Sequence, residues 1–173
     1  MTSNQPTLHI LCGKIASGKS TLASRLAAQP KTVLIVEDAW LEALFAEEMQ
    51  SLEDFAHCSG KLRGILGAHV AALLEAGVSV VLDFAANTRG QRSWFMGVVK
   101  ATGVPHKLHF LDVSDDVCLE RLRARNASGD HPFKVTDAQF REFTRYFSAP
   151  AADEGFIIVR RDGNQKDQEA PEA

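Results

Sequence analysis

A loop motif near the N-terminus restricts the folds open to this chain. The pattern G-x-x-x-x-G-K-[ST], known as the P-loop, is completed by Gly13, Gly18, Lys19 and Ser20. Glycine lets the backbone turn tightly enough for its N–H groups to converge on a phosphate, and the following helix points the positive end of its dipole at the same anion. Residues 8–11 have the apolar character of a strand, and residues 22–27 have helical spacing. In this setting the motif indicates nucleotide binding rather than an ordinary Gly-rich turn.

The residues of the loop have expected roles. The Lys19 ammonium is a mobile charge for the β- and γ-phosphates, and the Ser20 hydroxyl is placed to bind Mg²⁺. We therefore expect Lys19 to act in catalysis as well as in binding. The nucleotide-binding residues expected within the loop are Gly13, Ala16, Ser17, Gly18, Lys19, Ser20 and Thr21.

Length and composition are those of an ordinary globular protein. The 173 residues suit one domain, and 45% hydrophobic with 24% charged residues is typical of a soluble chain. The net charge of −3 gives no electrostatic reason to expect nucleic acid or an acidic membrane surface as a partner. No signal peptide is expected at the N-terminus, and no apolar run approaches the roughly 20 residues that span a bilayer. The three widely spaced cysteines fit reduced packing thiols, so we expect a cytoplasmic protein.

Strand and helix patterns alternate along the chain. Strands are expected at 8–11, 33–36, 78–82, 107–111 and 156–159. Helices are expected from Lys19 to about 27 and at 40–45, 61–76, 88–101, 115–125 and 136–147, with a weakly patterned stretch at 47–60. This alternation predicts an α/β protein of the P-loop NTPase fold, with a five-stranded parallel sheet flanked by helices. We expect one domain over 1–161 and a disordered tail at 162–173.

Ligands of such sheets bind at the carboxyl ends of the strands, which directs attention to Asp38. This residue follows the second expected strand, where a carboxylate can accept a proton from a hydroxyl that approaches the γ-phosphate. Asp is also favoured as a helix N-cap, so this structural role stays open beside the catalytic one. Glu37 is the weaker candidate for the base.

Asp83 ends the third expected strand and resembles a Walker-B carboxylate that orients Mg²⁺. The next residue is Phe84, where many ATP-driven machines carry a glutamate that activates water, and no Asn-Lys-x-Asp guanine-reading motif occurs. Both observations favour phosphoryl transfer onto another acceptor. Asn87 and Arg92 come next and are the expected substrate contacts, although an exposed arginine on a helix is common.

Arginines close the helix expected at 115–125. Arg121 and Arg125 are four residues apart and share a helix face. They either complement the helix C-terminus or belong to a mobile lid, at about 121–135, that clamps the phosphates. We expect the lid, with both arginines binding nucleotide and Arg125 contacting the reacting phosphates.

At these residues the chain resembles a known family. It is similar to small P-loop kinases related to zeta toxins, chloramphenicol phosphotransferase and phage polynucleotide kinase, and to AAA-domain proteins predicted to be ATP-binding kinases. The resemblance covers about 8–160 and rests on the P-loop, Asp38, Val80–Asp83 with Asn87 and Arg92, Arg121–Asn126, and Pro150 with Glu154–Phe156. It implies a five-stranded kinase core, Mg²⁺-ATP, Asp38 as base and a lid arginine near Arg125. In one departure, Leu41 stands where polynucleotide kinases carry an arginine.

The sequence thus predicts an ATP-dependent kinase that phosphorylates a hydroxyl of a small molecule. The segment 40–63 is expected to wall the acceptor pocket, and its acidic and aromatic residues suit a neutral or cationic acceptor. No nucleic acid or membrane is expected as a partner. The alternatives are an ATP-binding regulatory module without an acceptor, and a nucleotide or polynucleotide kinase.

Overall fold

The fold is built on a parallel sheet. The computed structural model describes residues 5–129 and 134–162. Within them the strands pair in the order β2-β3-β1-β4-β5, all parallel, which confirms the predicted five-stranded sheet. The strands are β1 Leu8–Cys12, β2 Thr32–Val36, β3 Ser79–Asp83, β4 His106–Asp112 and β5 Ile158–Asp162.

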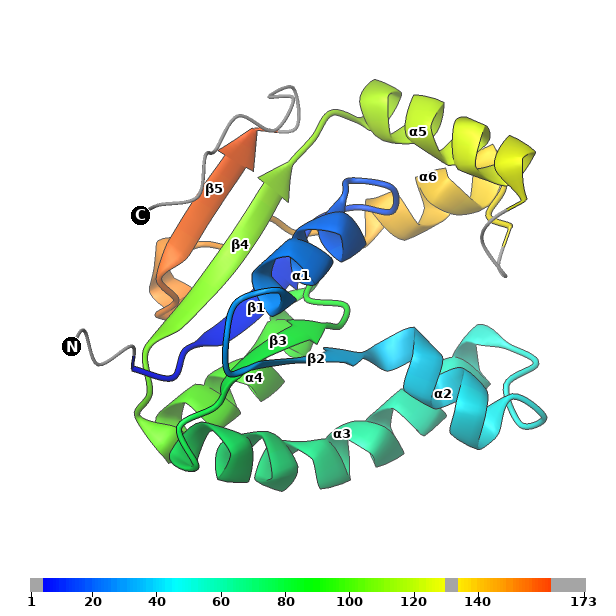
Figure 1. Ribbon diagram of the computed structural model, residues 1–173. Coiled ribbons are helices and arrows are strands. Elements are labelled where there is room, and N and C mark those ends of the chain that lie inside the picture. Colours follow the sequence, from blue (N-terminus) through cyan, green and yellow to red (C-terminus); the bar gives the residue numbers. More distant parts are fainter. Residues whose placement is uncertain (1–4, 130–133, 163–173) are drawn as a thin grey trace.

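Helices connect the strands and cover both faces of the sheet (Figure 1). They are α1 Lys19–Ala27, α2 Glu37–Phe45, α3 Leu52–Glu75, α4 Arg89–Thr102, α5 Asp115–Ser128 and α6 Asp137–Arg145, with a short 3-10 helix, η1, at Ala152–Glu154. On one face, α3 and α4 bury residues such as Leu66 and Phe95 against Ile10 and Leu82 of the sheet. On the other face, α1, α5 and α6 pack around Leu11, Val81 and Leu111 of the strands.

The sheet order fixes which loops meet at the carboxyl edge. Strand β1 lies between β3 and β4, so the P-loop follows the central strand and the loop after β3 lies beside it. Strand β2 is at the sheet edge, and β3 separates it from β1. Asp38 therefore follows a strand that is separated from the P-loop strand by β3.

Several element boundaries differ from the sequence predictions, and three of them bear on the site or the sheet. Helix α3 begins at Leu52 rather than near residue 61, since the Ser51 hydroxyl caps it by accepting from the Asp54 N–H at 3.1 Å. Helix α2 begins at Glu37 after the N-cap Val36, so Asp38 lies in the first turn and is not the N-cap. Strand β5 includes Asp162, which pairs with Asp112 of β4.

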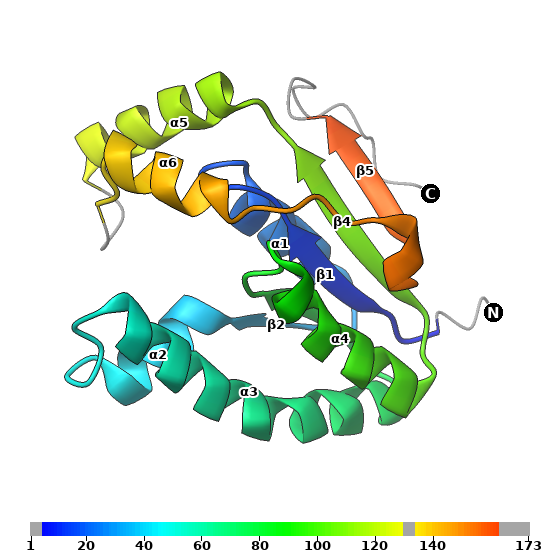
Figure 2. The ribbon, with the colours of Figure 1, turned by 180° about the vertical axis from the view of Figure 1, so that it is seen from behind.

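Helices α5 and α6 lie side by side and extend beyond the carboxyl edge of the sheet (Figures 1 and 2). Helix α5 contains residues 121–128 of the predicted lid. An ion pair between Arg123 and Asp137 links them, and the Asn126 amide donates to the Val135 carbonyl at 2.8 Å. Residues 130–133 of the predicted lid and residues 163–173 of the predicted tail lie outside the described residues.

Candidate active site

The P-loop turns sharply between β1 and α1. Ala16 and Gly18 have positive φ angles of 60° and 101°, and Gly18 is the N-cap of α1. A Cβ atom on Gly13 would lie 2.6 Å from the Ser17 Oγ and 3.2 Å from the Leu111 Cβ. Position 13 therefore accepts a side chain only if its neighbours move, which explains the first glycine of the motif.

Lys19 folds back onto this loop. Its Nζ donates to the Gly13 carbonyl at 2.7 Å and to the Lys14 carbonyl at 2.8 Å. Burial lowers the pKa of Lys19, and the carboxylates of Asp83 and, more weakly, Asp38 act in the opposite direction. The lysine therefore stands within the electrostatic influence of both acidic residues that the sequence singled out.

The two carboxylates differ in their surroundings. Asp83 is partly buried at the end of β3, whereas Asp38 is exposed in the first turn of α2. The Ser20 hydroxyl is exposed in the first turn of α1. A hydroxyl and a carboxylate oxygen are ligands that Mg²⁺ prefers, so Ser20 and Asp83 fit a magnesium ion that accompanies the nucleotide.

Glu37 is committed to the interior and does not fit the role of base. Its Oε1 accepts from the Ser59 hydroxyl at 2.5 Å and from the Arg63 Nε at 3.0 Å. Its Oε2 accepts from the Arg63 Nη2 at 3.1 Å and from the Ala85 N–H at 3.2 Å. With only 2% of its surface exposed, the carboxylate connects α2, α3 and the loop after β3.

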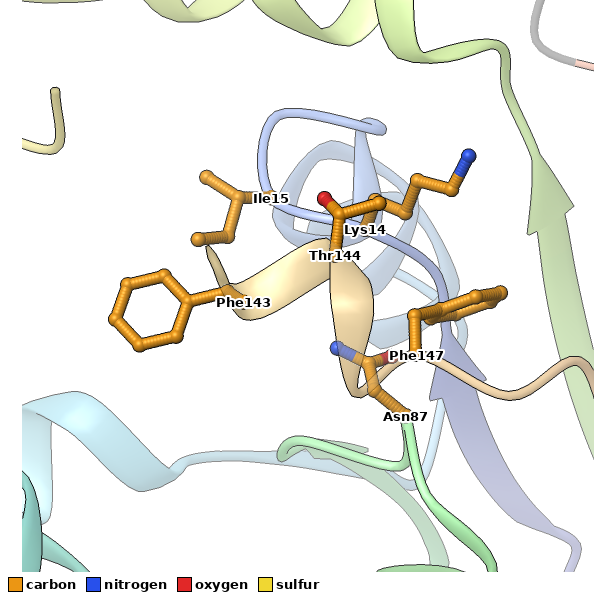
Figure 3. Close-up of a pocket in the computed structure, with 6 residues that line it drawn as sticks. All are labelled: Lys14, Ile15, Asn87, Phe143, Thr144 and Phe147. Atoms are coloured by element: carbon orange, nitrogen blue, oxygen red, sulfur yellow. The ribbon is translucent and has the colours of Figure 1, made fainter. Parts of the chain in front are cut away.

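Asn87 contacts the P-loop directly. Its Oδ1 accepts from the Gly13 N–H at 3.1 Å, although the two residues are 74 positions apart. Figure 3 shows Asn87 at the edge of a small cavity between the P-loop and α6. The other residues that line this cavity are Lys14, Ile15, Phe143, Thr144 and Phe147.

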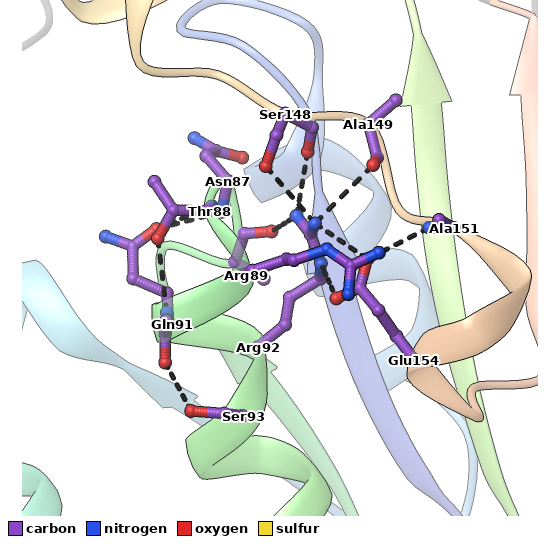
Figure 4. Close-up of polar contacts among 12 residues, drawn as sticks. Asn87, Thr88, Arg89, Gln91, Arg92, Ser93, Ser148, Ala149, Ala151 and Glu154 are labelled. Carbon is purple, nitrogen blue, oxygen red and sulfur yellow. Dashed lines mark hydrogen bonds and ion pairs between the residues drawn. The ribbon is translucent and has the colours of Figure 1, made fainter.

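Arg92 was expected to contact the substrate. It is fully buried, so it does not fit that role. Its guanidinium binds both carboxylate oxygens of Glu154, at 2.7 and 2.9 Å, and donates to the Ala86 carbonyl at 3.0 Å and the Ser148 carbonyl at 2.8 Å (Figure 4). The hydrogen bonds from Arg92 lower the pKa of Glu154. Arg92 therefore joins the loop after β3 to the segment before β5.

The two lid arginines are placed differently. Arg121 extends over the P-loop, where its Nη1 donates to the Ser17 carbonyl at 3.3 Å. Arg125 lies one turn further along α5, and its buried Nε has no hydrogen-bond partner among the described residues. Burial lowers the pKa of Arg125. In this structure Arg121 contacts the P-loop, and the expected contact of Arg125 with the reacting phosphates stays a prediction.

Sequence reasoning missed Lys14 and the end of α6. The Lys14 Nζ donates to the Val113 carbonyl at 3.3 Å, forms an ion pair with Asp115 and lies 5.8 Å from the centroid of the Phe147 ring. These contacts tie the P-loop to the start of α5 and to the chain after α6. The lysine inside the motif is a visible signal in the sequence. Its partners Val113 and Asp115, however, are about a hundred residues away along the chain, so local patterns do not reveal them.

No helix within residues 5–129 and 134–162 is long and apolar enough to cross a membrane.

Solved structures of similar fold include several kinases. A presumed kinase from Chloroflexus aurantiacus superposes with a TM-score of 0.72 at 23% identity, over 96% of this chain and 93% of that chain. APS kinase CysC from Mycobacterium tuberculosis, in complex with AMPPNP and APS, has a TM-score of 0.62 at 19% identity, over 94% and 91% of the two chains. At these identities the likeness establishes the fold, which is that of P-loop kinases.

Sequence comparison adds curated relatives and a family. Two proteins from Oryza sativa, of the subspecies indica and japonica, are each named Protein KTI12 homolog and are 28% identical over 129 residues. The match covers 71% of this chain but only 42% of the length of those relatives. The family model described as AAA domain, AAA_33, matches residues 8–150. The chain therefore belongs to this AAA domain family, and it has the fold of P-loop kinases.

Proposed function

We propose that this protein is an ATP-dependent phosphotransferase that transfers the γ-phosphate to a hydroxyl of a small-molecule acceptor. One observation carries the proposal. An exposed carboxylate, that of Asp38, stands at the carboxyl edge of the sheet within the electrostatic influence of the P-loop lysine, Lys19. An exposed carboxylate at this edge of the sheet, with Phe84 rather than a water-activating glutamate after Asp83, fits proton transfer from an acceptor hydroxyl.

The proposed step transfers the γ-phosphoryl group of ATP to the acceptor oxygen. The acceptor oxygen forms a bond to the γ-phosphorus, the bond from the γ-phosphorus to the β–γ bridging oxygen breaks, and ADP leaves. The hydroxyl proton passes to Asp38. Lys19, together with Arg121 and Arg125, provides positive charge along the phosphates, and Gly13 and the backbone from Ala16 to Thr21 bind them. Magnesium, bound by Ser20 and Asp83, would neutralise phosphate charge.

The surface beside Asp38 favours an acceptor without phosphate groups. Trp40 and Leu44 of α2 and Phe55 of α3 are exposed apolar side chains in the segment expected to wall the acceptor pocket. The nearby acidic residues are Glu42, Glu47, Glu48, Glu53 and Asp54. Position 41, where polynucleotide kinases carry an arginine, holds Leu41, which is buried at 1% exposure. The positive charge of Arg63 is paired with Glu37, so neither position offers an unpaired cation to a phosphodiester backbone. We infer a neutral or cationic hydroxylated molecule rather than nucleic acid.

We also place the protein in the cytoplasm. Cys12, Cys58 and Cys118 are buried free thiols, as expected in a reducing compartment. Burial raises the pKa of the Cys12 thiol to about 11, so this cysteine beneath the P-loop remains protonated and unreactive.

An acceptor screen with γ-labelled ATP tests the proposed function. Transfer of label to a hydroxylated metabolite would support a kinase. Binding of ATP without transfer to any acceptor would favour a regulatory module, and preferential transfer to a polynucleotide 5′ end would favour the polynucleotide kinase alternative. An Asp38→Asn control should transfer little or no label to the same acceptor.

A further inference from the structure

The orientation of the Asn87 side-chain amide is fixed by its contact with the P-loop. The Gly13 N–H is 3.1 Å from Asn87 and can only donate, so the atom that faces it is the amide oxygen. The NH₂ group of the same amide must then face the other way. Figure 3 shows it directed into the cavity between the P-loop and α6, toward Phe143 and Thr144.

The backbone around Asn87 holds this orientation in place. The Asn87 N–H donates to the Gln91 side chain at 2.9 Å, and the Asn87 carbonyl accepts from the Ser148 N–H at 2.8 Å. The buried Arg92 binds the carbonyls of Ala86 and Ser148 on either side (Figure 4). The donor is therefore preorganised before any ligand arrives, which reduces the entropy that ligand binding must overcome.

Asn87 and Lys19 bind the same residue of the loop. Asn87 accepts from the Gly13 N–H, and the Lys19 Nζ donates to the Gly13 carbonyl at 2.7 Å. In a P-loop the lysine reaches the β- and γ-phosphates, while the backbone N–H groups cradle the phosphates nearer the nucleoside. The Asn87 NH₂ group faces the cavity in front of Lys14 and Ile15, next to the loop residue that Lys19 also binds, and we infer that the γ-phosphate enters on this side.

We propose that the Asn87 NH₂ group donates a hydrogen bond to an oxygen of the γ-phosphate and makes the site prefer a nucleoside triphosphate over a diphosphate. The inference rests on nucleotide binding in the proposed function and adds a basis for its specificity. It requires no knowledge of the acceptor, because the phosphate itself is the ligand.

The test compares AMPPNP–Mg²⁺ with ADP–Mg²⁺ by calorimetric titration of the full chain. Asn87→Asp keeps an oxygen for the Gly13 N–H but replaces the NH₂ donor by a second oxygen. Asn87→Ala is neutral and removes the donor without adding charge. For both variants we expect AMPPNP affinity to fall about tenfold to a hundredfold more than ADP affinity, the usual effect of losing a hydrogen bond to a charged group.

The two variants separate recognition from simpler effects. Equal losses for ADP and AMPPNP in both would overturn the inference and leave Asn87 as a support of the loop. Selective loss with Asn87→Asp alone would also overturn it, because charge repulsion would then explain the result. Circular dichroism checks that each variant is folded. If the wild-type protein bound neither nucleotide, the proposed function would fail together with the inference, whereas the first two outcomes contradict the inference alone.

Discussion

Glu37 and Arg63 form a buried ion pair between α2 and α3, with the Arg63 Nε 3.0 Å and Nη2 3.1 Å from the two carboxylate oxygens. The guanidinium carbon also lies 5.3–5.5 Å from the ring centroids of Phe84, Trp94 and Phe95. Because Asp38 follows Glu37 directly, the pair fixes the start of the helix that carries the proposed base. The same carboxylate also binds the loop that leads from Asp83 to Asn87.

Breaking this pair from one side should destabilise the fold. Glu37→Gln leaves the Arg63 charge buried without its counterion, which we expect to lower the free energy of unfolding by about 3–5 kcal/mol. Chemical denaturation measures this change. The matched control, Glu42→Gln on the exposed side of α2, should stay within about 0.5 kcal/mol of wild type. Equal stabilities of the two variants would show that the pair contributes nothing.

Lys19 should matter for nucleotide binding far more than for stability. Lys19→Ala removes a charge bonded only to two loop carbonyls among the contacts described above, so the core is untouched. We expect ATP–Mg²⁺ affinity to fall by about tenfold to a hundredfold. Calorimetric titration compares it with Lys100→Ala, an exposed lysine of α4. Unchanged affinity for Lys19→Ala would contradict the assignment of the P-loop.

The lid should close over a triphosphate. Hydrogen exchange of the amides from Arg121 to Ser128 should slow with ATP–Mg²⁺ and hardly change with AMP, because only the triphosphate presents full charge to Arg121 and Arg125. An Arg121→Met variant should lose this difference. Protection that is the same with ATP and without nucleotide would leave the arginines as charges that complement the helix end.

Two histidines on the neighbouring strands β1 and β4, His9 and His109, should make stability depend on pH. The Arg161 Nε donates to the His109 Nδ1 at 3.4 Å, so the His109 Nε2 carries the proton and donates to the His9 Nδ1 at 3.0 Å. Burial, aided by nearby cations that include Lys107 and Arg161, lowers the pKa of His9 to about 4. Burial and, next, the charge of His9 lower the pKa of His109 to about 3.

The sign of the effect follows from proton binding. The unfolded chain protonates these histidines near pH 6.5, whereas the folded protein keeps them neutral, so stability is complete above pH 6.5 and falls as the pH drops toward 4. Between pH 7 and 5 each histidine should account for a loss of roughly 2 kcal/mol. Urea denaturation at both pH values measures this, and a His9→Gln, His109→Gln double variant should show a flatter profile. A wild-type profile as flat as that of the variant would contradict the neutral pair.

The sequence predicted the parts of the fold that depend on residues close together in the chain. The P-loop motif, the aliphatic strands and the order of strands and helices each depend on neighbouring residues. Helix α3 was predicted to start too late because residues 52–60 lack a regular apolar spacing, and its true start depends on the cap between Ser51 and Asp54.

The buried polar network was beyond sequence reasoning because its partners are distant in the chain. Arg92 looked like a surface arginine, and its counterion Glu154 is 62 residues away. Lys14 and Asp115 are 101 residues apart. Such pairs form only once the sheet order brings the loops together, and helix or strand periodicity carries no trace of them.

The central claim is that Asp38 accepts the proton during phosphoryl transfer. The claim is tested by measuring the single-turnover rate at which γ-labelled ATP transfers its label to the acceptor found by screening. The rate is compared between wild type and Asp38→Asn. We predict unchanged ATP affinity and a rate lower by roughly two to four orders of magnitude, the range expected for a general base. Because Asp38 is not the N-cap of α2, loss of helix stability would not explain such a decrease. A fully active Asp38→Asn variant, or a polynucleotide as the best acceptor, would contradict the account.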